Sequence, residues 1–77
     1  MPNFKSTFTS DKISTRPKRR RAVDTLISEL KMIRDAEEAY IHRIPLNLQS
    51  GDAYSAADNC IETLTDAIDI LSDAYYQ

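Results

Sequence analysis

The 77-residue chain contains one cysteine, one glycine and no tryptophan, and these scarcities exclude several kinds of protein. Cys60 has no partner for a disulfide within the chain, and no Cys/His cluster has the spacing of a structural zinc site. Gly51 alone leaves little material for a glycine-rich phosphate-binding loop. No apolar run approaches the roughly 18 residues of a membrane span. We therefore predict a small protein with no cofactor, no metal and no membrane partner.

The start of the chain also lacks the apolar stretch of a secretory signal. Together with the lone cysteine, this predicts a reducing compartment, the cytoplasm.

Lysine and arginine are absent after Arg43, although the net charge of the whole chain is only -2. Residues 1–23 carry seven bases and one acid, a net charge of +6. Residues 24–43 carry three bases and five acids, and residues 44–77 carry six acids and no base. Such a division suggests a basic segment and an acidic segment with different partners.

A first helix is predicted over residues 22–43. Upstream, Pro17 suits a first helical turn, with Thr15 or Arg16 just outside it as the cap. The apolar side chains step by three and four residues, which is a heptad seam. Glu37 interrupts this seam once, Ile27 and Ile41 widen it, and its members are Val23, Leu26, Leu30, Ile33, Tyr40 and Ile44.

A turn over residues 44–50 separates this helix from a second one, predicted over residues 51–75. Pro45 ends the first helix because the residue before a proline is pushed out of the helical region. Ser50 is the predicted N-cap of the second helix. Leu46 and Leu48 are predicted to close the turn against Tyr40 and Tyr54. The second helix has an unbroken seam of Tyr54, Ala57, Ile61, Leu64, Ile68, Leu71 and Tyr75.

Two seams of similar length joined by a short turn predict an all-α fold, an antiparallel two-helix hairpin that resembles a coiled coil. Residues 22–77 form this hairpin, and residues 1–21 are predicted to be an extended or disordered basic arm in which Phe4 and Phe8 are either anchors or incidental. Two helices alone bury little apolar surface. We therefore expect a homodimer that forms a four-helix bundle, or a hairpin stabilised by a partner.

The basic residues upstream of Ala22 form the first candidate site. Long blocks of like charge are usually interaction tails. Nucleic acid is one candidate partner, since each phosphate contact releases counterions. An acidic protein surface is a second, and a solubilising collar or a clamp on the chain's own acidic helix is a third. The candidate residues are Lys12, Arg16, Lys18, Arg19, Arg20 and Arg21.

Five acids of the second helix step by four, four, three and four residues, so they share one side of it. They are a candidate surface for a basic protein partner, although a solvated helix face is the commoner meaning of such a stripe. Glu37 lies on the first seam, where it either pairs with Arg34 or another chain or marks a place open to water. The acids of the stripe are Asp58, Glu62, Asp66, Asp69 and Asp73.

We find no Ser/His/Asp set, no paired catalytic carboxylates and no cofactor motif, so we predict a protein that is not an enzyme. Cys60 is predicted to be a small buried apolar residue rather than a nucleophile.

One stretch resembles a known kind of protein. It comprises Leu30, Ile33-Arg34-Asp35, Glu37-Glu38, Tyr40, Ile44-Pro45 and Leu48-Gln49, followed by an alanine-rich acidic helix. This pattern resembles small uncharacterised helical-hairpin proteins of bacteriophage and prophage genomes, over about Leu26 to Tyr75. Leu46 and Ala36 depart from it, since the pattern usually has acids there.

The resemblance implies a phage accessory protein in the cytoplasm of a host cell. The leading hypothesis is therefore a protein that binds and inhibits or modulates a host protein of defence or nucleic-acid machinery. A nucleic-acid-binding protein that uses the basic arm is the alternative, and a structural bundle subunit is the third.

Overall fold

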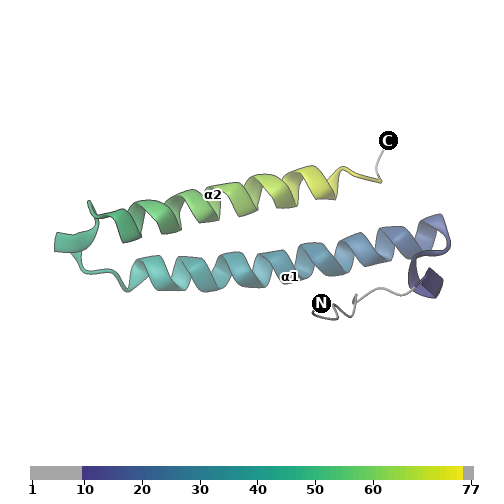
Figure 1. The fold of residues 1–77 in the computed structure, drawn as a ribbon, viewed down its shortest axis with the longest axis horizontal. Helices are drawn as coiled ribbons and strands as arrows, with labels where there is room; N and C mark the ends of the chain where they lie inside the picture. The colour runs from purple at the N-terminus through teal and green to yellow at the C-terminus, as the bar shows by residue number, and fades with distance from the viewer. Residues whose placement is uncertain (1–9, 76–77) are drawn as a thin grey trace, which may run out of the picture.

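Two long helices pack antiparallel as a hairpin in the computed structural model, which describes residues 10–75 (Figure 1). A short 3-10 helix, η1 (Ser10–Ile13), precedes α1 (Arg16–His42). A second 3-10 turn, η2 (Leu46–Leu48), leads to α2 (Asp52–Ser72). The predicted all-α hairpin is confirmed. Residues 1–9, with Phe4 and Phe8, lie outside the described part of the chain.

Helix α1 begins at Arg16, six residues before the start predicted for the hairpin. Thr15, one of the two residues expected as the cap, is its N-cap, with an extended backbone and a side-chain oxygen that accepts a hydrogen bond from the Lys18 N–H at 3.3 Å. Pro17 occupies the first turn, where its missing N–H costs nothing. The basic run is helical because lysine and arginine have high helix propensity once a cap and a proline have started the helix.

The turn differs from the prediction at two places. Gly51 is the N-cap of α2 in place of Ser50, and no side chain bonds to the helix start. Gly51 has an ordinary φ of -83°, but a Cβ there would lie 3.2 Å from the Leu48 carbonyl oxygen. The glycine thus allows a close approach of backbone within the turn. Leu46 and Leu48 do not close the turn, because both side chains are exposed.

The seam predicted for α2 is confirmed. Its seven residues are all buried or half-buried, with Ala57 and Ile68 the most enclosed. An unbroken apolar heptad leaves one way to orient a helix against its neighbour. Side chains of α2 therefore form one wall of the core along its whole length.

The seam predicted for α1 is only partly right. Ile27 and Ile41, expected at its edge, are buried at 8% and 7% exposure, and the helix is turned so that they face α2. The predicted seam residues Leu26, Ile33 and Tyr40 are exposed at 39%, 55% and 43%. Compared with the predicted orientation, α1 is rotated about its own axis. One apolar stripe therefore lies in the core, and a second apolar stripe lies outside it.

Candidate binding surfaces

The residues of α1 that face α2 most directly are Ile27, Arg34 and Ile41, and we call them the inner line of α1; the seam of α2 is its inner line. Arg34 lies midway between the two isoleucines, with 24% of its side chain exposed. Its Nε atom is buried and has no hydrogen-bond partner, and the nearest acid is Asp35, at 3.6 Å from Nε to Oδ1. Asp35 is largely exposed, so this contact adds little stability. The structure shows no pairing of Arg34 with Glu37, which is half-buried on the same helix.

An apolar stripe on α1 lies beside this inner line. Leu26, Ile33 and Tyr40 each precede an inner residue by one position and therefore lie about 100° around the helix from it. On α2 the equivalent stripe has mostly small side chains, with Ile70 the large exception; they step by three and four residues, and all but the half-buried Ala67 are exposed. It consists of Ala53, Ala56, Cys60, Thr63, Ala67, Ile70 and Ala74.

The two stripes lie on the same face of the hairpin. In each helix the stripe lies on the lower-numbered side of the inner line, and in antiparallel helices that side is shared. We call this surface the apolar face: Leu26, Ile33, Ala36 and Tyr40 of α1 with the small stripe of α2. Cys60 is exposed here rather than buried as predicted, because it lies on the flank of α2.

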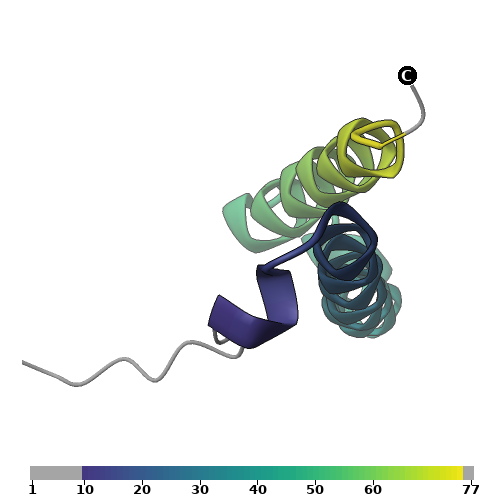
Figure 2. The same ribbon diagram turned by 90° about the vertical axis from the view of Figure 1, so that its right-hand side faces the viewer.

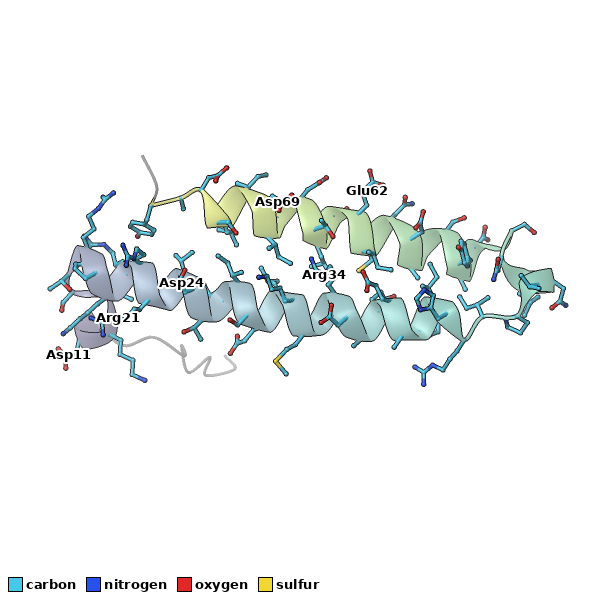
Figure 3. All side chains as sticks on the ribbon, turned by 180° about the vertical axis from the view of Figure 1, so that it is seen from behind. Asp11, Arg21, Asp24, Arg34, Glu62 and Asp69 are labelled. Carbon is cyan, nitrogen blue, oxygen red and sulfur yellow. The ribbon has the colours of Figure 1, made fainter. Side chains whose placement is uncertain are left out.

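The opposite surface is charged, and Figure 3 looks onto it, with Asp24 on α1 and Glu62 and Asp69 on α2. We call it the charged face. The five predicted acids of α2 are all exposed. Within residues 10–75, none of these acids has a basic group within 4 Å, since the ion pair found there joins Arg34 and Asp35. Their negative charge is therefore left to solvent.

Four of the six basic candidate residues divide into two groups. Lys18 and Arg19 hold η1 against α1: Lys18 Nζ donates to the Asp11 carbonyl at 3.0 Å, and Arg19 Nη1 donates to the Ile13 carbonyl at 3.1 Å. Ala22 lies on the same side of α1, one turn further on, and is buried. Figure 2 shows η1 beside the first turns of α1. Lys18 and Arg19 thus have structural contacts within the chain.

Arg16 and Arg20 belong to the second group. With Pro17 and Tyr75 they line an open pocket of about 260 Å³ at the end of the hairpin opposite the turn. The Arg16 guanidinium carbon lies 5.1 Å from the centre of the Tyr75 ring, which is a cation–π contact. Lys12, in η1, and Arg21 are exposed outside this pocket.

Two residues of these surfaces were missed from the sequence. Arg34 was considered only as a partner for Glu37, and Tyr75 only as the last seam residue. The length of the helices could have placed Tyr75 correctly. Since α1 begins at Arg16, the C-terminal end of α2 lies beside that start, and Tyr75, three residues beyond α2, meets the basic run.

Over residues 10–75 the structure brings together no group of three His, Cys, Asp or Glu side chains suited to a metal ion. In the same part of the chain, neither long helix is apolar enough over a sufficient length to span a bilayer.

Comparisons with known proteins add no relative: no family model, curated protein or solved structure matches this chain. The resemblance to phage hairpin proteins therefore stays a prediction.

Proposed function

We propose that this chain is a non-enzymatic protein-binding module that docks on another polypeptide through the apolar face of its hairpin. The observation that carries this proposal is the exposure of Leu26, Ile33 and Tyr40 as one stripe beside the small residues of α2. Modulation of a larger host protein, the leading hypothesis from the sequence, would be one form of such binding.

The small core supports the proposal. Among residues 10–75 the buried residues are three isoleucines and two alanines, Ala22, Ile27, Ile41, Ala57 and Ile68. Domains of this size rarely gain enough stability from one core, and the chain has no disulfide to add to it. A partner that covers the apolar face would bury a second set of apolar side chains and stabilise the folded hairpin.

Site-specific photo-crosslinking tests the proposal in cells that express the full chain. A photoreactive phenylalanine analogue replaces either Ile33, on the apolar face, or Ser28, which is exposed on the other side of Ile27 from Leu26. We expect adducts larger than the 8.8 kDa chain from position 33 and far fewer from position 28. Equal yields from both positions, or no adduct from position 33, would refute docking through the apolar face.

A second candidate function is binding of nucleic acid at the open end of the hairpin. The observation that favours it is the pocket in which Arg16 and Arg20 lie beside the Tyr75 ring. Guanidinium groups bind phosphates, and an aromatic ring offers a base a surface on which to stack. The positive end of the α1 dipole adds to the attraction for an anion.

This candidate predicts a salt dependence carried by the pocket arginines. In the double variant Arg16→Gln/Arg20→Gln, the slope of log affinity against log salt for mixed-sequence single-stranded DNA should fall by about 1.4, roughly 0.7 per lost phosphate contact. The matched control Lys31→Gln/Arg43→Gln removes two charges distant from the pocket and should change the slope much less. Fluorescence anisotropy titrations at several salt concentrations measure both slopes. If the slopes of the two variants agree, the pocket does not bind the nucleic acid.

A further inference from the structure

We infer that the polypeptide on the apolar face is a second copy of this chain, with α1 of each hairpin packed across α2 of the other. The product is a four-helix bundle with a two-fold axis parallel to the helices and both turns at the same end. This inference rests on the proposed function, because it names the partner of the same face.

Side-chain size supports this arrangement. On the apolar face α1 presents large side chains apart from Ala36, whereas α2 presents alanine and cysteine apart from Thr63 and Ile70. Packing α1 of one copy over α2 of the other places large side chains against small ones, and such pairs interdigitate at native density. If α1 lay on α1 and α2 on α2, large would meet large along one half of the interface, and small would meet small along the other.

Charge favours the same arrangement. Residues 22–42 of α1, which lie level with α2, carry two bases and five acids, a net charge of -3, whereas α2 carries five acids and no base. Each α2 would therefore lie beside a helix that offers two bases, Lys31 and Arg34. The alternative arrangement would set two helices of net charge -5, with no base on either, side by side. Like charges at close range are unfavourable, so the proposed packing brings less like charge together.

The available area fits a stable dimer. Helix α2 has 21 residues and is therefore about 32 Å long. Two helices of about 10 Å diameter make the face roughly 20 Å wide, so the flat area is on the order of 600 Å² per copy. Side-chain relief increases this value, which then approaches the roughly 800 Å² that each partner buries in a standard interface.

The arrangement also predicts which residues meet. His42 ends α1 and Asp52 begins α2 at the same end of the hairpin, so these two residues lie at the same height along the helix axes. Because the helices are antiparallel and rise equally per residue, each residue before His42 in α1 is level with the residue equally far after Asp52 in α2. On this count Ile33 is level with residue 61, next to Cys60. An axis parallel to the helices preserves these levels between copies, so Ile33 of one copy faces Cys60 of the other.

Sedimentation equilibrium on the full chain tests the second copy. We expect a mass that rises with concentration to twice 8.8 kDa. Ile33→Glu places a charge in the interface twice per dimer and should weaken the dimer by on the order of a hundredfold. Ser28→Glu adds the same charge on another side of α1 and should leave the dimer intact. The mass of a single chain at every concentration, or equal weakening by both variants, would overturn the inference.

Cross-linking tests the arrangement without relying on a destabilised variant. Under oxidation, Ile33→Cys should give a covalent dimer through a disulfide between position 33 and the native Cys60 of the other copy, and Ile33→Cys/Cys60→Ala should not. A covalent dimer that persists in the double variant would show α1 on α1 and overturn the proposed packing. If the chain is monomeric while photo-crosslinks from position 33 join it to a different protein, the second copy is refuted and the proposed docking function stands.

Discussion

Truncation of one side chain, Ile68→Ala, should lower the free energy of unfolding by about 2–5 kcal/mol, the range found when large aliphatic side chains are removed from a core. Ile68 is 4% exposed and lies on the inner line of α2. It is one of three buried isoleucines in residues 10–75, so its loss removes a large part of the core. Chemical denaturation followed by far-ultraviolet circular dichroism measures the change at a fixed protein concentration.

Met32→Ala is the control for this substitution. Met32 is 71% exposed and lies on the side of α1 that points away from α2, so its truncation should change the free energy of unfolding by less than about 0.5 kcal/mol. If the two substitutions cost the same, Ile68 is not part of a packed core, and the orientation of α2 described above is wrong.

Arg34→Leu should stabilise the fold, by about 1–2 kcal/mol. Arg34 interrupts the inner line of α1 between Ile27 and Ile41, and its buried Nε atom has no hydrogen-bond partner. An unsatisfied buried donor costs roughly 1–3 kcal/mol, and a leucine of similar helix propensity would remove that cost and extend the apolar seam. Thermal or chemical denaturation of the variant measures the gain.

Arg43→Leu removes the same charge at the exposed C-cap of α1 and serves as the control, with little expected effect on stability. A loss of stability in Arg34→Leu alone would mean that the guanidinium group of Arg34 binds carboxylates of α2 in solution. In that case the arginine would contribute to the hairpin rather than interrupt its core.

The outcome for α1 shows where sequence patterns were sufficient and where they were not. For α2 a single apolar heptad was present, and its seam was predicted residue by residue. Helix α1 has two adjacent apolar stripes, one with Leu26, Ile33 and Tyr40 and the other with Ile27 and Ile41. A charged residue interrupts either seam, Glu37 in the first and Arg34 in the second, so the pattern alone did not decide between them.

The physical difference between those two charged residues accounts for the observed rotation. Arginine has a long aliphatic stem that packs along apolar surface while its charged end reaches toward solvent. Glutamate is shorter and brings its charge closer to the core, where an unpaired carboxylate is costly. The structure places Arg34 on the inner line and leaves Glu37 half-buried at its edge.

The sequence was enough to predict which charged residues form the candidate sites, but not which contacts those residues make. The basic run and the acidic stripe follow from counting residues, and both are exposed on the structure as groups. The division of the basic run does not follow from counting. It depends on η1, whose carbonyl groups accept hydrogen bonds from Lys18 and Arg19 and leave Arg16 and Arg20 to the pocket with Tyr75.

A dimer formed through the apolar faces would direct both charged faces outward. Each would present the acids of one α2, and the two basic ends would lie together at the end opposite the turns. The bundle would then offer a basic partner two equivalent acidic surfaces, and a nucleic acid two adjacent basic ends. The surfaces that the sequence suggested for a basic protein partner and for a nucleic acid would thus both stay accessible in the dimer.

The reactivity of the native thiol of Cys60 tests the central claim most directly, because this single cysteine lies exposed on the apolar face and needs no substitution. The account predicts that the rate of its reaction with a thiol reagent falls as the concentration of the full chain rises, because the second copy covers it. The unfolded chain in denaturant gives the rate for an uncovered thiol. A rate in native buffer that stays constant from nanomolar to millimolar protein would contradict the claim that a second copy occupies this face.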